Sequence, residues 1–178
     1  MSVDTAALVE GWRAEALRGE RVSREVCAPD GALLNYHARI IARPLDELYQ
    51  RLARMGGGLD DVWPMAPVPM KAEGALQPGV RAAHGPIRYE LVAVENGCRI
   101  EWRFTMEHLH GRYEYTLSAM DAGTLVENVI DGAVTGEMIG VWPSAVGPLH
   151  DWVLERILDR LEAPPAPWFD PRAIRLIR

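Results

Sequence analysis

The sequence is poor in cysteine, and its two cysteines, Cys27 and Cys98, are far apart with no CxxC spacing. Such usage is typical of unpaired thiols in a reducing compartment and not of a disulfide framework. No apolar run approaches the length of a transmembrane helix, and the first twenty residues lack the apolar segment of a signal peptide. We therefore expect a cytoplasmic protein that does not insert into a membrane.

Basic residues are in the minority, with 19 Lys and Arg against 25 Asp and Glu, so the net charge is −6. A general nucleic-acid-binding surface needs a concentrated basic face, and we therefore expect no nucleic-acid partner. The sequence also lacks a phosphate-binding glycine loop, a dinucleotide fingerprint and a Ser–His–Asp spacing. These absences predict no bound cofactor.

Apolar residues are plentiful, at 48% of 178 residues, which suits one domain with a real core. Residues 5–19 have weak helical character, and the PDG sequence at residues 29–31 is a turn signal. Prolines after residue 162 end the last helical pattern. We therefore divide the chain into an N-terminal helical arm (1–30), a folded domain (31–162) and a proline-rich tail (163–178).

Alternation with period two predicts a strand over residues 33–43 with one face buried. Its apolar positions are Leu34, Tyr36, Ala38 and Ile40, and they alternate with the polar positions Asn35, His37 and Arg39. A helix over residues 44–55 should follow, with Pro44 in its first turn and three glycines ending it. Residues 59–69 leave room for a second short helix before their prolines prevent it.

Six short strand-like runs occupy residues 71–134, separated by turn residues such as Asn96 and Gly97. Residues 142–162 then form an amphipathic helix, in which Leu149, Val153, Ile157 and Leu161 recur every four residues. A helix cannot bury such a stripe alone, and a meandering antiparallel sheet normally buries one face. The sequence therefore predicts an α+β fold in which the C-terminal helix covers the sheet.

Alternation along the strands also predicts which side chains face this helix. The inward positions are rich in rings that carry a polar tip, which suit a pocket lined mainly by carbon with a few hydrogen-bonding groups. We favour a cavity over the alternative, a solid core. The predicted ligand-binding residues are Tyr89, Trp102, Phe104, Tyr113, Tyr115, Asn128, Ile130, His150 and Val153.

Several segments resemble one known superfamily, the helix-grip proteins of the START and Bet v 1-like group, also called SRPBCC. The resemblance covers about residues 33–162 and includes YHARIIARPLDELYQRL, HGPIRYELVAVENGCRIEWRF, GTLVENVIDG and WPSAVGPLHDWVLERILDRLE. HGPIRY and the final helix are its most distinctive parts, and the polyketide cyclase/dehydrase-like branch is the most similar.

The resemblance implies a curved seven-stranded antiparallel sheet around a long C-terminal helix, with two short helices after the first strand. It also implies a hydrophobic cavity, which in relatives holds lipids, sterols, polyketides, quinones or hormones, and in some of them cyclises or dehydrates polyketides. Similar sequences often carry His where this chain has Asn128. That departure favours binding over catalysis.

Candidate catalytic groups are few. His84 is a candidate general acid or base at the cavity mouth, although a turn histidine bonded to backbone is the simpler interpretation. Tyr115 is a candidate to polarise a ketone oxygen. His150 either touches a ligand or hydrogen-bonds to the sheet. His108 and His110 form an HxH pair, but a third ligand is missing, and we predict no metal site.

Three classes of function stay open. The first is a binder of a small hydrophobic molecule, and the second is a polyketide cyclase or dehydratase. The third is a protein–protein adaptor whose tail, PWFDPRAIRLIR, docks on a partner or on a second copy. A homodimer is compatible with all three.

Overall fold

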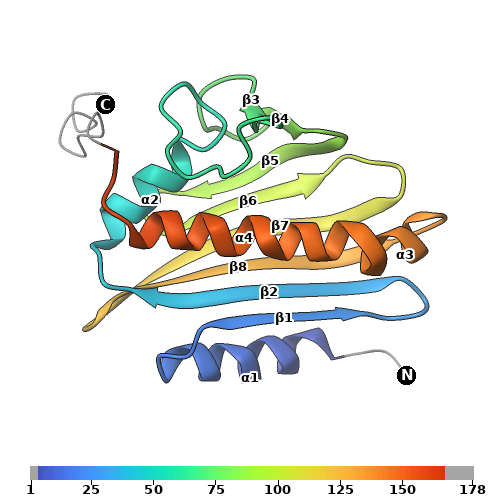
Figure 1. Ribbon diagram of the computed structural model, residues 1–178, viewed down its shortest axis with the longest axis horizontal. Helices are drawn as coiled ribbons and strands as arrows, with labels where there is room; N and C mark the ends of the chain where they lie inside the picture. Colours follow the sequence, from blue (N-terminus) through green and yellow to red (C-terminus); the bar gives the residue numbers. More distant parts are fainter. Residues whose placement is uncertain (1–3, 167–178) are drawn as a thin grey trace.

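The structure is a computed structural model and describes residues 4–166 of the chain. It is an α+β helix-grip fold with one antiparallel sheet in the order β1-β2-β8-β7-β6-β5-β4-β3 (Figure 1). The strands are β1 (Val22–Cys27), β2 (Ala32–Ile41), β3 (Lys71–Ala72), β4 (Arg81–His84), β5 (Ile87–Glu95), β6 (Arg99–Phe104), β7 (Leu109–Met120) and β8 (Gly123–Val134). The helices are α1 (Thr5–Leu17), α2 (Leu45–Ala53), α3 (Met138–Val141), the π-helical turn η1 (Trp142–Val146) and α4 (Gly147–Glu162).

The six strands predicted after residue 70 are confirmed, and the sheet has eight strands instead of seven. The additional strand, β1, lies in the segment predicted as a helical arm and pairs with β2 along its whole length. The Asn96–Gly97 turn joins β5 to β6, with positive φ at Gly97 (90°). It is a three-residue turn that includes Cys98, so Asn96 keeps an ordinary negative φ.

The sheet is covered on both faces. Helix α4 runs across one face, along β8 and β7, and α1 lies against the other face near β1 and β2 (Figure 1). The main core fills the space between α4 and the sheet and includes the predicted inward residues of β5, β6 and β7. A smaller core lies under α1, where Trp12 and Ala16 pack on Tyr36.

This second layer corrects the prediction that β2 buries only its apolar face. Tyr36 and Ala38 lie under α1, whereas Asn35, His37 and Arg39 lie on the α4 side. The register explains this, because residues directly opposite in a sheet share a face. On the α4 side the pairs are Asn35 with Ile130, His37 with Asn128, and Arg39 with Val126. Both faces of β2 are therefore buried.

Glu127 shows the same effect on β8. It points outward as predicted, but α1 covers it and only 6% of it is exposed. Its carboxylate accepts a hydrogen bond from the Tyr36 hydroxyl at 2.7 Å and pairs with Arg13 at 3.3 Å. Burial and the Glu127 carboxylate both raise the pKa of Tyr36, so the phenol remains a hydrogen-bond donor.

Only one of the two short helices predicted after β2 forms. Within residues 54–70 the chain makes turns, since Asp60 accepts hydrogen bonds from the backbone N–H groups of Val62 and Trp63, and prolines follow. The helix that does form, α2, carries the buried Arg51. Its guanidinium pairs with Asp61 and donates to the carbonyls of Arg160, Leu161 and Ala163, which closes the C-terminal end of α4.

The predicted C-terminal helix is confirmed, but part of its apolar stripe is not buried. Val153, Ile157 and Leu161 lie in the core as expected, whereas 51% of Leu149 and 47% of Trp152 are exposed. Two prolines, Pro143 and Pro148, interrupt the regular bonding before and within the first turn of α4. There the Gly147 N–H bonds to the Trp142 carbonyl, five residues back, which makes the π-helical turn η1.

The division of the chain at residues 30 and 162 stays a prediction. The tail segment proposed to dock on a partner, PWFDPRAIRLIR, lies outside the described residues. Among the helices of residues 4–166, none has the length and apolar character needed to cross a bilayer.

Candidate functional site

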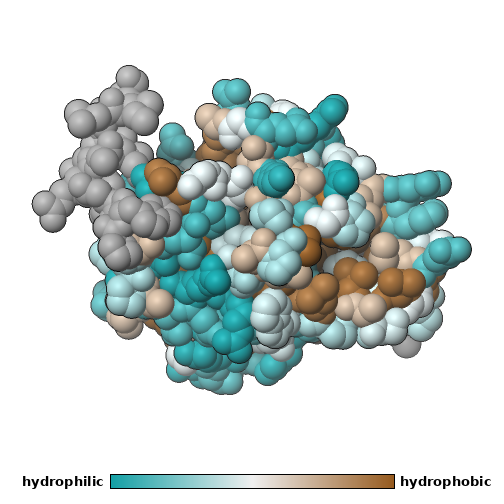
Figure 2. All heavy atoms as spheres, turned by 45° about the horizontal axis from the view of Figure 1, so that its top comes forward, coloured by the Kyte–Doolittle hydropathy of each residue, from teal (hydrophilic) through white to brown (hydrophobic). Residues whose placement is uncertain are grey.

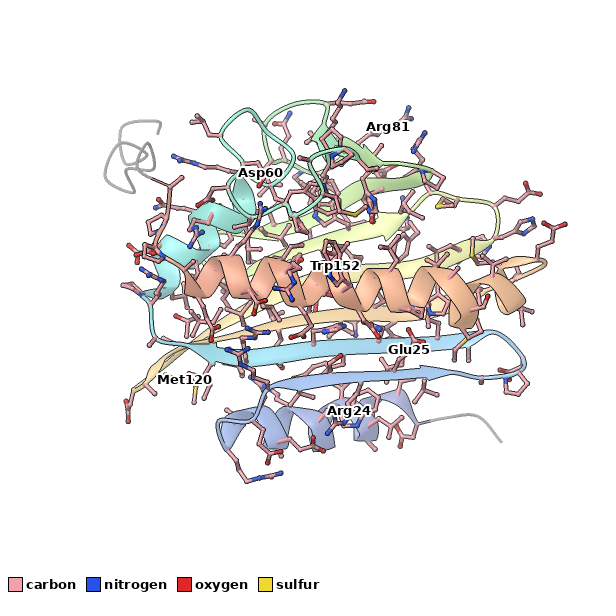
Figure 3. All side chains as sticks on the ribbon, viewed as in Figure 1. Arg24, Glu25, Asp60, Arg81, Met120 and Trp152 are labelled. Atoms are coloured by element: carbon pink, nitrogen blue, oxygen red, sulfur yellow. The ribbon has the colours of Figure 1, made fainter. Side chains whose placement is uncertain are left out.

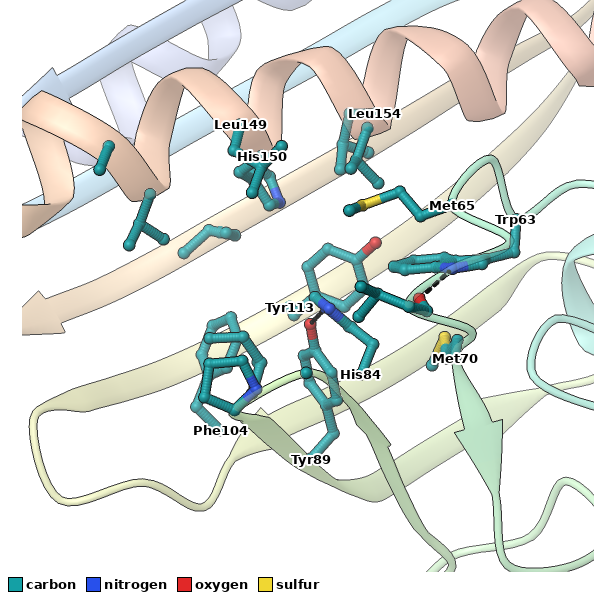
Figure 4. A pocket seen from close by; sticks show the side chains of 18 of the residues that line it. Trp63, Met65, Met70, His84, Tyr89, Phe104, Tyr113, Leu149, His150 and Leu154 are labelled. Atoms are coloured by element: carbon teal, nitrogen blue, oxygen red, sulfur yellow. Dashed lines mark hydrogen bonds between the residues drawn. The ribbon is translucent and has the colours of Figure 1, made fainter.

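A cavity of about 320 Å³ lies between the sheet, the first half of α4 and the loop that follows α2 (Figure 4). Its walls are mainly carbon, and Leu149 lies at the exposed side of the helix. Figure 2 shows hydrophobic side chains gathered on one part of the molecular face and a mainly hydrophilic surface beside them. The lining residues are Trp63, Met65, Val68, Met70, His84, Gly85, Pro86, Ile87, Tyr89, Phe104, Tyr113, Ile130, Trp142, Ala145, Val146, Leu149, His150, Val153 and Leu154.

The cavity brings together some of the residues predicted to bind a ligand and leaves others in the core. Tyr89, Phe104, Tyr113, Ile130, His150 and Val153 line it. Trp102, Tyr115 and Asn128 do not line it; they are buried behind the wall, at 2%, 0% and 0% exposure. The ligand-binding roles of all nine remain predictions.

His84 lies on the cavity wall, and within residues 4–166 its ring hydrogen-bonds to a side chain and not, as the simpler interpretation had it, to backbone. Its Nε2 lies 2.6 Å from the Tyr89 hydroxyl, and its ring packs on Trp63 with centroids 4.7 Å apart (Figure 4). Burial, together with the charges of His150 and Arg88, lowers the pKa of His84 to about 4. The imidazole is therefore neutral near pH 7, and its Nε2 can accept a hydrogen bond from the Tyr89 hydroxyl, which keeps its proton.

Tyr113 and Tyr115 are joined through their hydroxyl oxygens, which are 2.8 Å apart. Burial raises the pKa of both phenols, so both keep their protons. Of the pair, only Tyr113 lines the cavity, and Tyr115 lies behind it. Asn128 donates its amide to the Glu114 carbonyl at 3.1 Å, and its Oδ1 has no partner in the described residues.

His150 provides the polar group of the helix side of the cavity. Burial lowers its pKa, so the ring is neutral at pH 7. Its Nδ1 lies 3.9 Å from Asp151 Oδ1, beyond hydrogen-bond range. Within residues 4–166 neither ring nitrogen has a hydrogen-bond partner. A buried donor and acceptor left unpaired is uncommon and indicates a place for a further group.

Sequence analysis missed the wall built by the loop after α2. Trp63, Met65, Val68 and Met70 come from this segment, which has no period of either strand or helix. The loop is fixed by the Asp60 side chain and by a hydrogen bond of 2.9 Å from the Trp63 indole to the Val68 carbonyl. A tryptophan and two methionines in a proline-rich loop were the available signal, since these residues rarely face water without a reason.

A polar seam lies beside the cavity, where α4 faces β2. Asp151 Oδ1 accepts from Asn35 at 2.7 Å and lies 3.1 Å from His37 Nε2, while Glu155 lies 2.8 Å from His37 Nδ1. Burial opposes charge on His37, but its hydrogen bonds to Asp151 and Glu155 outweigh burial and raise its pKa. Burial would likewise raise the pKa of Asp151, yet His150, His37 and Asn35 lower it.

Glu25 of β1 extends this seam, and Figure 3 places it beside the beginning of α4. It accepts hydrogen bonds from the Trp142 indole at 2.9 Å and from Asn35 at 3.1 Å.

The HxH pair, His108 and His110, lies away from the cavity and the seam. His108 is 3.3 Å from the Thr135 hydroxyl, His110 is exposed, and Gly111 lies within β7 instead of at a hairpin edge.

The fold is similar to that of solved bacterial proteins. Protein Ms6760 from Mycobacterium smegmatis aligns with a TM-score of 0.57 and 17% identity, over 83% of this chain and 98% of its own. CV1439 from Chromobacterium violaceum aligns with a TM-score of 0.55 and 15% identity, over 79% and 99%. MLL2253 from Mesorhizobium loti aligns with a TM-score of 0.54 and 19% identity, over 72% and 93%. At such identities the likeness shows the fold alone. No protein-family model matches the chain, and no curated protein matches it by sequence.

Proposed function

We propose that the protein binds a small, mainly apolar and uncharged molecule in the cavity between the sheet and α4. The observation that carries the proposal is an apolar cavity whose polar side chain on α4, His150, has no hydrogen-bond partner for either ring nitrogen among the described residues. The helix-grip fold supports it, because the resemblance to START and Bet v 1-like proteins implies a ligand in the same place.

The polar groups of the cavity wall determine what kind of molecule fits. Among the described lining residues none is Asp, Glu, Lys or Arg. The pKa shifts of His84 and His150 are downward and those of Tyr89 and Tyr113 are upward, so all four are neutral at pH 7. A buried carboxylate or ammonium on the ligand would have no counter-charge, which is costly. A hydroxyl or carbonyl group would instead find an N–H donor and a nitrogen acceptor at His150.

Ligand binding is tested by titrating a fluorescent apolar probe into the purified full chain and by native mass spectrometry after mild purification. We expect saturable binding of one probe molecule. Leu149→Trp should weaken it at least tenfold by filling the exposed side of the cavity, whereas Val92→Trp, at an exposed position of β5 outside the cavity, should not. Unsaturable binding, or equal affinities of the two variants, would contradict the proposal.

An enzyme of the cyclase or dehydratase type is the second candidate. The observation in its favour is the His84–Tyr89 hydrogen bond of 2.6 Å at the cavity wall, a neutral base next to a phenol donor. Positioning of a folded ketone chain and exclusion of water would supply the rest. A poly-β-ketone surrogate is incubated with the wild type, His84→Ala and Tyr115→Phe. Product profiles identical to buffer in every sample would remove this candidate.

A further inference from the structure

Three potential metal ligands from two distant parts of the chain meet at the edge of the cavity. They are His37 on β2 and the adjacent residues His150 and Asp151 on α4, and one ligand atom from each lies within 4.8 Å of the others. Their separation in sequence is more than a hundred residues. The juxtaposition therefore depends on the packing of α4 against the inner face of β2.

The surroundings of His37 orient it as a ligand. Its Nδ1 is 2.8 Å from Glu155 Oε1, and its Nε2 points at Asp151 Oδ1 at 3.1 Å. Both ring nitrogens face carboxylates, so a metal ion at this place would replace the Nε2 proton that is shared with Asp151, while Nδ1–H would keep its hydrogen bond to Glu155. A carboxylate behind a ligating histidine is the usual arrangement around protein-bound zinc, because it fixes the tautomer and makes the ligand more basic.

Asp151 is held in a similar way. Asn35 Nδ2 donates to Asp151 Oδ1 at 2.7 Å and to Glu25 Oε2 at 3.1 Å, so the amide connects the cluster to β1. Two of the three ligands, His37 and Asp151, are therefore each oriented by a hydrogen bond to a residue outside the cluster.

His150 can become the third metal ligand without losing a hydrogen bond. In a tetrahedral site with metal–ligand bonds of about 2.0–2.1 Å, neighbouring ligand atoms lie about 3.3 Å apart. His37 Nε2 and Asp151 Oδ1 are already at that spacing, and His150 Nδ1 lies 3.9 Å from Asp151 Oδ1. The His150 ring gives up no hydrogen bond when it closes the difference, because its nitrogens have no partner among the described residues.

The charge of the seam favours a cation at this place. Asp151 and Glu155 contact His37 directly, and Glu25 shares the Asn35 amide with Asp151. The nearest buried cation, Arg39, bonds to Glu155 and also to Asp159 and Glu162 further along α4. The Asp151 and Glu155 side chains are 36% and 33% exposed, so the cluster is a half-buried acidic site that solvent can reach, and a divalent ion would add positive charge beside its carboxylates.

We propose that His37 Nε2, the Asp151 carboxylate and His150 Nδ1 form a binding site for a divalent transition-metal ion, with Zn²⁺ as the best match. Two imidazoles and one carboxylate suit zinc, and three protein ligands leave a fourth position for water or a bound group. His150 also lines the cavity, so the ion would lie at its wall. The proposal rests on the cluster alone and holds whether or not an organic ligand binds.

The test uses the full chain after treatment with a chelator, titrated with ZnCl₂ in a calorimeter and with CoCl₂ in the visible range. We expect one equivalent to bind, and cobalt to give the absorption of a four-coordinate site. Asp151→Asn and His150→Gln should each weaken zinc binding at least tenfold, and Glu155→Gln should weaken it by a smaller factor. His110→Gln, at an exposed histidine of the unrelated HxH pair, is the matched control and should bind as the wild type does.

His150→Gln removes no hydrogen bond of the structure, so the variant is expected to fold, and circular dichroism checks this. Absence of stoichiometric binding to the wild type would overturn the proposal and leave a metal-free ion-pair cluster. Undiminished affinity in a folded His150→Gln, or loss of binding only in His110→Gln, would overturn it as well.

Discussion

The two sides of α4 differ in how they meet the sheet. Toward β2 the helix makes directional polar contacts, in which Arg39, 2% exposed, bonds to Glu155, Asp159 and Glu162 at 2.5–3.1 Å. Toward β5, β6 and β7 it presents apolar side chains, and in its first half these leave a cavity. One helix therefore has a tightly paired side and an incompletely filled side.

The difference indicates how a cavity can persist under a helix. Apolar surfaces tend to close over empty space, because unfilled volume costs packing energy. Ion pairs and hydrogen bonds on the β2 side fix the position of α4 by geometry, and Arg51 fixes its C-terminal end. The apolar side can then keep an unfilled cavity.

Breaking the polar side should have the largest effect on stability. Arg39→Met keeps the side-chain volume but leaves three carboxylates without their buried cation, and we expect a loss of about 3–4 kcal/mol in the free energy of unfolding. Urea denaturation measures it. Arg21→Met is the control, since Arg21 pairs with the same Asp159 and Glu162 but is 62% exposed, and it should cost less than about 1 kcal/mol. Equal losses would show that burial of Arg39 is unimportant.

Truncations on the apolar side should separate its filled half from its open half. Ile157→Ala, at a position with 0% exposure, should cost about 3 kcal/mol, because a cavity is created in packed core. Leu149→Ala should cost less than about 1 kcal/mol, since half of this side chain already meets solvent. The same denaturation assay compares them, and a Leu149 loss as large as that of Ile157 would contradict an open first half.

The pH dependence of stability should report on the cavity wall. The pKa of His84 is about 4 in the fold, and an unfolded chain has a value of about 6.5. Between these values the unfolded chain binds a proton that the fold excludes, so the free energy of unfolding falls as pH decreases from 6.5 to 4, by roughly 2.5 kcal/mol. The slope due to His84 fades within about one pH unit above 6.5, where the unfolded chain no longer binds the proton either.

The measurement is urea denaturation of the wild type and His84→Gln at several pH values between 7 and 4. The variant lacks the titrating group, so the difference between the two proteins should grow toward acid pH. A difference that is constant with pH would show that His84 is readily protonated in the fold.

A smaller effect should distinguish neutral from charged ligands. Displacement of a fluorescent probe from the chelator-treated protein is measured for 2-naphthalenemethanol and for 2-naphthoate, which share a ring system. The alcohol should bind at least about tenfold more tightly, equivalent to about 1.4 kcal/mol, because no described lining residue offers a positive charge to the carboxylate. Tighter binding of the naphthoate would contradict an uncharged cavity.

Local pattern was sufficient for most of the strands and for α4. Strong turn residues such as Asn96 and Gly97, and the four-residue spacing of Val153, Ile157 and Leu161, are properties of neighbouring residues, and they were read correctly. Strand β1 was not predicted because the apolar and polar residues of its sequence, VSREVC, do not alternate regularly. The prediction of a second short helix was wrong because the Asp60 side chain accepts hydrogen bonds from backbone N–H groups that a helix would use.

The face of β2 could not be predicted from its own sequence. Asn35, His37 and Arg39 look solvent-facing until their partners on α4 are known, and those partners are more than a hundred residues away. The same limit applies to the proposed metal ligands, because His37 and Asp151 are unremarkable separately. Of the candidate site, sequence analysis found much of the sheet wall but not the loop wall with Trp63, which has no period to detect.

The π-helical turn η1 determines the direction in which the side chains of α4 point around the helix axis. One extra residue in a turn advances the following helix by about 100° around its axis. Trp142, before the turn, directs its indole to Glu25, while Val153 and Ile157, after it, face the core. Deleting a single residue from 143–146 would swing one of these groups out of place. This stretch should therefore accept changes of side chain far more readily than changes of length.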